Sequence, residues 1–287
     1  MPVRNGGTLL HDVLRAVRAQ TVDAELVVAD SGSTDGSAEL ARSFGATVIP
    51  VARFSHGGTR NLLMERTAGE HVAFLTQDSV PASDGWLEAL LGGFGGDVAL
   101  AFGPARARPG APVAVARELD DWFASFGGAR VDRGSPHGPG AQTFFSSANG
   151  AVARAAWREV PFPDVAYAED QALAVAMLRA GYGKAYVPEA AVIHSHEYGP
   201  LAQFRRTFDE WEALNAVHGW VQPWRNTLLT LQSEVRKDVR YAGGVSAREL
   251  ARSVRHWSVR AAGAAAGSRA GRLPPRVRAW CSLEGRG

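Results

Sequence analysis

Cysteine is nearly absent from this chain. Among 287 residues only Cys281 carries a thiol, so no disulfide can form within the chain. The sequence also lacks a run of about 18 apolar residues, the length that a membrane-spanning helix requires, and no apolar signal segment follows Met1. These absences argue against a disulfide-stapled fold and against a helical membrane protein. We expect a cytoplasmic protein, with peripheral contact at the inner face of the plasma membrane as an option.

A glycine-rich phosphate loop with a lysine is missing as well. Nucleotidyl transfer normally uses such a loop after a strand, so this activity ranks low. Residues 225–287 hold 13 Lys and Arg against 4 Asp and Glu, whereas residues 1–224 hold 18 against 25. Because the basic residues lie outside the acidic body, we expect no nucleic-acid partner. Such a basic segment binds anionic lipid or an acidic protein surface, or is a solvated helical appendage.

Short apolar runs alternate with helical patterns through the first hundred residues. The runs at 26–29, 47–50, 71–75 and 98–102 are predicted strands, and the segments between them are predicted helices. This alternation is typical of an α/β fold with a mostly parallel sheet and crossover helices. We predict an α/β domain over residues 1–224 and a basic helical region over residues 225–287.

Within the basic region, one helical segment has two distinct faces. Arg248, Arg252 and Arg255 share the first face. Apolar residues form the second, and they are Ala247, Leu250, Ala251 and Val254. The pattern predicts a basic amphipathic helix, a kind of segment that binds membrane surfaces.

Two carboxylates follow predicted strands directly. Asp30 comes after the strand at 26–29 and Asp78 after the strand at 71–75. In an open parallel sheet, ligands bind beyond the carboxyl ends of the strands, so both side chains are predicted to face one crevice. Asp30 then recognises a base or ribose, or it only closes a turn. The glycines before the helix that carries Arg60 are predicted to present free N–H groups to a phosphate.

The ordered set of motifs resembles the family 2 glycosyltransferases. It comprises Pro2-Val3-Arg4-Asn5-Gly6-Gly7, then Val27 to Ser37 with its Asp-Ser-Gly-Ser-Thr-Asp-Gly core, then Thr59-Arg60-Asn61, then Gly69 to Asp78. The Phe-Leu-Thr-Gln-Asp form ending at Asp78, the Glu169-Asp170 pair and the run from His194 to Tyr198 are similar to the bacterial rhamnosyltransferase branch. The resemblance implies a GT-A fold, a nucleotide-diphosphate-sugar donor, Mg²⁺ or Mn²⁺ as cofactor, and an inverting reaction.

Roles for individual residues follow from this resemblance. It implies that Asp30 contacts the base, that Asp78 holds the metal, and that Asp170 is the catalytic base. On the donor side it places Pro2, Asn5, Arg60, Gln77 and Arg206. Gln77 stands where the family often has a first acidic residue, so the donor diphosphate becomes a necessary co-ligand of the metal.

Several assignments stay open at the level of sequence. Glu169 is either the base, an acceptor-side residue or a helix-start acid stabilised by the helix dipole, and we favour Asp170 as the base. His194 and His196 alternate, and we choose His196 as a metal ligand, against the alternative of one packed and one exposed histidine. Asn149 contacts a sugar hydroxyl or belongs to a plain turn.

Two departures from the family pattern matter. The chain reads Gly103-Pro104-Ala105 where the rhamnosyltransferase branch tends to have Gly-Arg-Gln, which leaves the donor open among dTDP-rhamnose and UDP- or GDP-sugars. Met1 directly precedes Pro2, so we expect a truncated first strand and a natural start upstream of Met1.

The predicted function is inverting, metal-dependent sugar transfer to a hydroxyl of a glycan or lipid-linked acceptor. The alternative is a catalytically impaired nucleotide-sugar-binding scaffold. A homodimer is a further option that the sequence does not decide.

Overall fold

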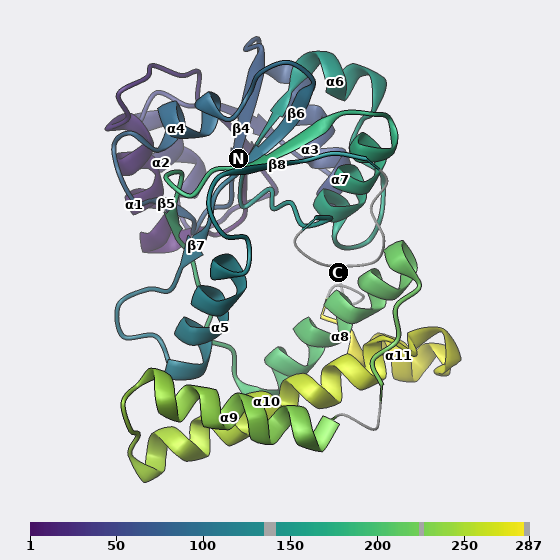
Figure 1. The fold of residues 1–287 in the computed structure, drawn as a ribbon. Helices are drawn as coiled ribbons and strands as arrows, with labels where there is room; N and C mark the ends of the chain where they lie inside the picture. Colours follow the sequence, from purple (N-terminus) through teal and green to yellow (C-terminus); the bar gives the residue numbers. More distant parts are fainter. Residues whose placement is uncertain (135–141, 224–226, 284–287) are drawn as a thin grey trace. The chain divides into compact units, whose positions relative to one another are not determined.

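The computed structural model describes residues 1–134, 142–223 and 227–283 (Figure 1). The backbone forms two compact units. The first contains Met1–Arg106, Phe123–Val165 and Glu169–His194, and the second contains Ala107–Trp122, Ala166–Ala168 and the chain from Ser195 onward. The boundaries between these units therefore differ from the predicted domain boundary at residue 224. The basic region belongs to the same unit as helices that precede it in the sequence.

The first unit opens with a parallel three-stranded sheet in the order β1-β2-β3. The strands alternate with helices, as predicted, and the elements are β1 (Pro2–Val3), α1 (Gly7–Arg18), β2 (Val27–Asp30), α2 (Ser37–Ser43), β3 (Thr47–Pro50) and α3 (His56–Arg66). Leu10, Val13 and Leu14 are spaced for one helical face of α1, and all three are fully buried against the sheet.

A five-stranded sheet in the order β4-β9-β6-β10-β8 forms the centre of the first unit. Its strands are β4 (His71–Leu75), β6 (Val98–Phe102), β8 (Arg130–Asp132), β9 (Asn149–Ala153) and β10 (Gly183–Tyr186). β9 runs antiparallel to both β4 and β6, and β8 runs antiparallel to β10. The first unit thus mixes parallel and antiparallel pairs, because β9 returns between two strands of the predicted parallel set.

Shorter elements complete this unit. A small sheet joins β5 (Val80–Pro81), β11 (Val192–Ile193) and β7 (Ala105–Arg106), and the remaining helices are α4 (Trp86–Gly92), α6 (Arg154–Glu159) and α7 (Glu169–Arg179). β4, β6 and β10 point in one direction, so the segments that follow them lie at one edge of the sheet. That edge carries Asp78.

One charged pair lies inside the apolar core. The Lys184 side chain is fully buried, its Nζ lies 2.9 Å from Asp132 Oδ2, and it sits 4.6 Å from the centre of the Phe102 ring. Burial lowers the pKa of Lys184 to about 8, and the facing Asp132 carboxylate opposes that shift. The pair ties β10 to β8 within the core.

The second unit consists largely of helices. They are α8 (Pro200–His218), α9 (Thr227–Tyr241), α10 (Ala247–Gly267) and α11 (Pro275–Cys281), joined by the part of α5 (Val113–Ala124) that ends at Trp122. α10 packs tightly on α8, since a Cβ at Gly267 would stand 2.2 Å from the Phe208 carbonyl oxygen. Within the described residues, none of the helices has the length and apolarity needed to traverse a bilayer.

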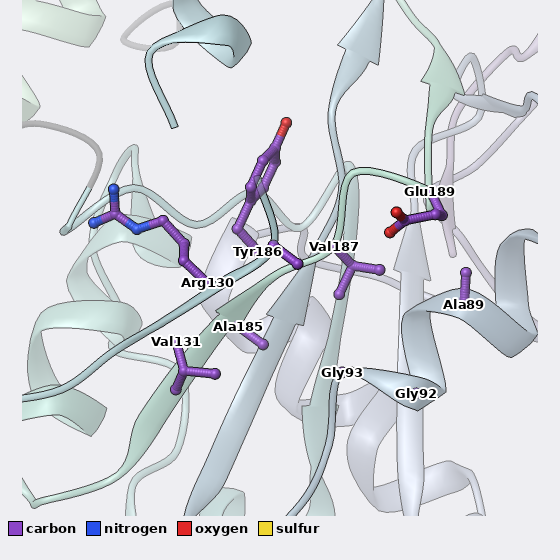
Figure 2. Close-up of a pocket in the computed structure, with 10 residues that line it drawn as sticks. Ala89, Gly92, Gly93, Arg130, Val131, Ala185, Tyr186, Val187 and Glu189 are labelled. Carbon is purple, nitrogen blue, oxygen red and sulfur yellow. The ribbon is translucent and has the colours of Figure 1, made fainter. Parts of the chain in front are cut away.

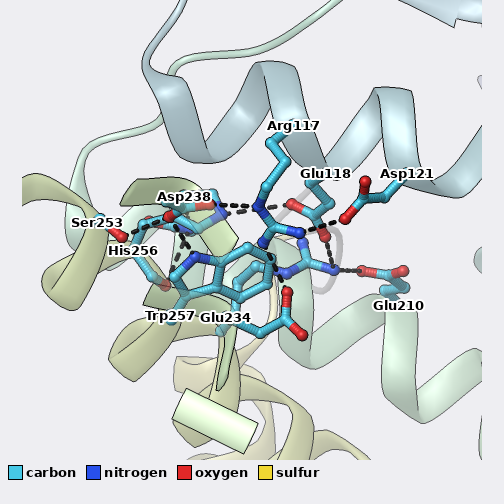
Figure 3. Close-up of polar contacts among 11 residues, drawn as sticks. Arg117, Glu118, Asp121, Glu210, Glu234, Asp238, Ser253, His256 and Trp257 are labelled. Carbon is cyan, nitrogen blue, oxygen red and sulfur yellow. Dashed lines mark hydrogen bonds and ion pairs between the residues drawn. The ribbon is translucent and has the colours of Figure 1, made fainter. Parts of the chain in front are cut away.

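A buried ion network holds this helical unit together (Figure 3). Arg117 of α5 donates to Asp238 and Glu234 of α9 at 2.5 and 2.6 Å. Asp238, which is fully buried, also accepts hydrogen bonds from Ser253 and Trp257 of α10. The polar side of α10 therefore faces the protein interior.

Both faces predicted for α10 lie outside that packing. The three arginines are exposed, and so are the apolar residues at 247, 250, 251 and 254. Leu250 and Val254 are 40% and 41% exposed. The helix is amphipathic as predicted, but its apolar side is turned away from the core of its own unit.

Candidate active site

The ends of β1, β2 and β4 are joined by side-chain hydrogen bonds. Gln77 accepts a hydrogen bond from the Arg4 N–H at 2.8 Å, and Asn5 accepts one from the Thr34 N–H at 2.8 Å. Asn5 has a positive φ of 51°, which suits an asparagine in a tight turn. Pro2 lies opposite Ala29 in the parallel ladder. These predicted donor-side residues build the loops around the crevice.

Asp30 ends β2 with one oxygen committed and one free. Its Oδ2 accepts hydrogen bonds from the N–H groups of Gly32 and Ser33 at 3.3 and 3.2 Å, the turn geometry anticipated for it. Its Oδ1 is buried and has no hydrogen-bond partner among the described residues. A buried carboxylate oxygen without a donor is costly, so this atom is suited to accept from a ligand N–H or O–H.

Asp78 lies beside a histidine of a different strand. Its Oδ1 is 3.5 Å from His194 Nε2, and both side chains are largely buried. β11 ends at Ile193, and this places His194 at the same edge as Asp78. One carboxylate oxygen and one imidazole nitrogen at this distance suit a divalent cation of the Mg²⁺ or Mn²⁺ type. His196, the histidine chosen from the sequence, lies two residues further on in the second unit.

Arg60 does not stand at a phosphate site in this structure. Its guanidinium Nη1 lies 2.9 Å from Glu169 Oε1, and both side chains are almost fully buried. The start of α3 is closed as well, because Ser55 accepts from the Gly58 N–H and a Cβ at Gly57 would stand 2.2 Å from the Pro163 carbonyl oxygen. The protein itself thus uses the Gly58 N–H and packs closely at Gly57, and the phosphate contact at this helix start stays a prediction.

Asp170 is held at the start of α7 by hydrogen bonds to both carboxylate oxygens. Oδ2 accepts from the Ser147 N–H at 3.1 Å, and Oδ1 accepts from the Gln171 N–H at 2.8 Å. Burial, followed by the neighbouring Glu169 carboxylate, raises the pKa of Asp170 to about 6, while Arg60 and the two N–H donors oppose that shift. The side chain keeps partial exposure, so it can reach a ligand. A carboxylate of this kind is able to take a proton near neutral pH.

Asn149 differs from its predicted role in sugar binding. Its side chain is buried, accepts from Trp86 Nε1 at 2.8 Å, and donates to the carbonyl oxygens of Pro104 and Ala190 at 3.1 and 2.8 Å. Two of these bonds tie β9 to the segments after β6 and β10, and the third ties it to α4. Asn149 is therefore a structural residue, since its amide is already used.

Arg206 of α8 lies over an aromatic ring of its own unit. Its guanidinium carbon is 4.5 Å from the centre of the Tyr167 ring. Tyr167 precedes Ala168, whose φ is +58°, and the Glu169-Asp170 pair follows directly. The contact places Arg206 beside the segment that leads into α7.

One groove of the first unit lies elsewhere. It has a volume of about 550 Å³, and Ala89, Gly93, Arg130, Tyr186, Val187 and Glu189 are among its lining residues (Figure 2). None of the predicted site residues lines it. The groove is therefore distinct from the strand-end crevice.

Comparison with known proteins identifies the family. The glycosyl transferase family 2 pattern matches residues 1–147. The chain belongs to this family. It is 35% identical over 234 residues to the O-antigen chain rhamnosyltransferase RfbN of Salmonella typhimurium (strain LT2), a match that covers 77% of this chain and 73% of RfbN. It is 33% identical over 233 residues to the O-antigen chain rhamnosyltransferase WbaN of Salmonella anatum, with the same coverages of 77% and 73%.

Solved structures support the GT-A fold of this family 2 protein. The mannosyltransferase PcManGT from Pyrobaculum calidifontis, solved with GDP-Man and Mn²⁺, matches with a TM-score of 0.62 at 16% identity, over 93% of this chain and 85% of that one. S. aureus TarS with UDP-GlcNAc matches with a TM-score of 0.55 at 13% identity, over 92% and 89%. The predicted fold class and the predicted glycosyltransferase activity are both confirmed.

Sequence reasoning missed Ser147 and left His194 undecided. Ser147 lies in a run of phenylalanines and serines that carries no catalytic pattern, and only the fold brings it to Asp170. His194 directly follows β11, which ends at Ile193, whereas His196 lies two residues further along the chain.

Proposed function

We propose that this family 2 glycosyltransferase moves a sugar, rhamnose in the first instance, from a nucleotide diphosphate to an acceptor hydroxyl with inversion at the anomeric carbon. The observation that carries the proposal is Asp170, a fixed and partly exposed carboxylate whose pKa is raised to about 6. The relation to the Salmonella rhamnosyltransferases supports rhamnose as the first sugar to test.

In the proposed reaction Asp170 takes the proton of the acceptor hydroxyl. The hydroxyl oxygen forms a bond to the anomeric carbon on the face opposite the diphosphate, and the bond from that carbon to the diphosphate oxygen breaks. The nucleoside diphosphate leaves with the electron pair of the broken bond. One displacement inverts the anomeric centre, and the base contributes about 10²- to 10⁴-fold to the rate.

Asp78 and His194 are the proposed protein ligands of Mg²⁺ or Mn²⁺. The 3.5 Å spacing of an oxygen and a nitrogen donor supports this assignment. A bound divalent cation would neutralise charge on the departing diphosphate. Gln77 is neutral and already accepts from the Arg4 N–H, so the protein supplies a single carboxylate at the end of β4.

Asp30 is proposed to read the nucleoside. Its Oδ1, which has no donor within the part of the chain that the structure describes, can accept from a base N–H or a sugar O–H of the nucleoside. The dTDP-, UDP- and GDP-sugars all carry both kinds of group. A screen of these donors by thermal shift with Mn²⁺ identifies the donor, because a ligand that binds only the folded state raises apparent stability.

Asp170→Asn tests the assignment of the base. We expect transfer of the sugar to fall by at least about 10²-fold, with donor binding unchanged. Asp84→Asn, at an exposed position of the same unit, is the matched control and should keep full activity. An active Asp170→Asn variant would refute the role of Asp170. Donor binding by the wild type without turnover of any donor would instead support the scaffold alternative.

We further propose that the exposed side of α10 rests on the inner face of the plasma membrane, where a lipid-linked acceptor would be presented. The support is an apolar strip with Leu250 and Val254 flanked by the exposed Arg248 and Arg255, while the polar side of the helix is buried around Asp238. Apolar side chains beside basic ones suit the boundary between anionic headgroups and acyl chains.

Binding to vesicles with and without anionic lipid tests this contact. Removing residues 225–287 would strip α9, α10 and α11 from α8, so point variants are the better probes. Arg248→Gln with Arg255→Gln should weaken binding to anionic vesicles by about 10- to 30-fold, at roughly 1 kcal/mol for each basic residue. Arg66→Gln with Arg158→Gln makes the same charge change on exposed residues of the first unit. Equal binding by both pairs would refute the proposal.

A further inference from the structure

Arg60 is a buried cation whose one carboxylate partner among the described residues lies beside the proposed catalytic base. Its Nη1 lies 2.9 Å from Glu169 Oε1 and also donates to the His56 carbonyl oxygen at 3.1 Å. Its Nε is buried without a partner among the described residues. Two contacts therefore fix the guanidinium in the interior of the first unit, one to its own helix α3 and one to the start of α7.

Ser147 connects the two adjacent carboxylates. Its hydroxyl lies 3.3 Å from Glu169 Oε1 and 3.4 Å from Asp170 Oδ2, and its N–H donates to the same Asp170 oxygen at 3.1 Å. The hydroxyl has one hydrogen, so it serves one carboxylate at a time. The arrangement is a chain of contacts that runs Arg60, Glu169, Ser147, Asp170.

Charge makes this chain matter for the reaction. Two carboxylates this close do not both ionise easily in a buried site unless a cation compensates them. Helix α3 contributes Arg60, whose guanidinium contacts Glu169 of the carboxylate pair. His56 lies one turn earlier on the same helix. From β10 the charged group is Lys184, whose Nζ is committed to Asp132. Arg60 is thus the cation that contacts the Glu169 side of the pair, and its charge opposes the rise in the pKa of Asp170.

We propose that Arg60 is a positioning residue of the transfer reaction, which acts through Glu169 and Ser147 to hold Asp170 as the group that accepts the acceptor proton. This inference rests on the proposed function of Asp170. It differs from the donor contact that the family resemblance implied for Arg60, and the two roles predict different measurements.

Variants of the pair should move the pH dependence of transfer in opposite directions. Arg60→Met removes the compensating cation, so the midpoint of the rise of kcat with pH should move upward by about one unit or more, with a fall in kcat. Glu169→Gln removes the repelling carboxylate, so the midpoint should move downward. The donor KM should stay within about twofold in both variants, because neither side chain contacts the donor in this role. Arg60→Lys keeps the charge and should restore most of the wild-type midpoint.

The double variant Arg60→Met with Glu169→Gln guards against a failure to fold. It removes both charges of the buried pair together, so no uncompensated charge remains in the core. Because Arg60 acts through Glu169, we expect Arg60→Met to change the midpoint little once Glu169→Gln is present, with Asp170 intact. An additive effect of the two changes on the midpoint would contradict the chain of contacts.

Titration of the Asp170 carboxyl by ¹³C NMR separates the inference from the proposed function. A signal that titrates at higher pH in Arg60→Met than in wild type supports the positioning role, even if no sugar donor is turned over. A weaker affinity for the nucleoside diphosphate with an unchanged carboxyl titration would overturn the inference and return Arg60 to the donor site.

Discussion

Replacing Asp170 by asparagine should make the protein more stable at neutral pH while it removes activity. The pKa of Asp170 is raised to about 6 in the folded protein, from an ordinary value of 3.8. Below about pH 4 the carboxyl holds its proton in both states and contributes nothing. Between about pH 4 and 6 the folded state keeps the proton that the unfolded state releases, so the free energy of unfolding falls as pH rises.

The magnitude follows from the size of the shift. A pKa raised from 3.8 to about 6 corresponds to an effect on the order of 3 kcal/mol, at about 1.36 kcal/mol for each pKa unit. The wild type should lose this amount between about pH 4 and 7, whereas the asparagine variant has no carboxyl to ionise. In the variant, the NH₂ group of the asparagine amide faces the N–H of either Ser147 or Gln171, so two hydrogen-bond donors meet. The free-energy cost of this contact is the same at every pH.

Urea unfolding of both proteins between pH 4 and 8 measures the effect. The stability of the variant relative to the wild type should rise by about 3 kcal/mol over this range and level off above pH 7. Asp84→Asn, at an exposed site, is the control for the change of net charge. A constant difference between variant and wild type at all pH values would refute the account of Asp170 as a desolvated carboxylate.

Three further predictions concern the core, the backbone and the metal site. Asp132→Asn should cost about 3–5 kcal/mol of stability by urea unfolding because it removes the carboxylate that faces the buried Lys184. Lys184→Met should cost far less, and equal costs would contradict the ion-pair argument. Gly103→Ala should prevent stable folding, since its Cβ would stand 1.8 Å from a carbonyl oxygen. Gly92→Ala, with open space at the end of α4, should be neutral or stabilising by up to about 1 kcal/mol in thermal unfolding. Asp78→Asn should weaken Mn²⁺ binding by calorimetry in the presence of a nucleoside diphosphate by about tenfold or more, and an unchanged affinity would place the metal elsewhere.

The local pattern of the chain predicted the first half of the fold well. Runs of apolar residues bounded by turn residues located β2, β3, β4 and β6, because a buried strand and its turn depend on neighbours in sequence. The antiparallel return of β9 between β4 and β6 was not predicted. Strand order and direction depend on which edges are free once the other strands have paired, and that information is not local.

Individual site residues show the same division. Asp30, Asp78 and Asp170 were identified by their position after a strand or at a helix start, which a linear motif records. Asn149 and Arg60 were given ligand roles, yet their side chains are used inside the protein. A motif gives the type and place of a residue, but its hydrogen-bond partners come from segments 40 or more positions away, as with Asn149 and Ala190.

The sequence alone determined the family and the α/β fold and singled out three carboxylates as candidates, since each depends on residue types at fixed spacings. The tertiary structure decided which polar groups are satisfied and which stay open to a ligand. It left one oxygen of Asp30 without a donor among the described residues, paired Arg60 with Glu169, and turned the apolar side of α10 outward. The physical reason is that burial and pairing set the cost of each polar or charged group, and both arise only when distant segments pack together.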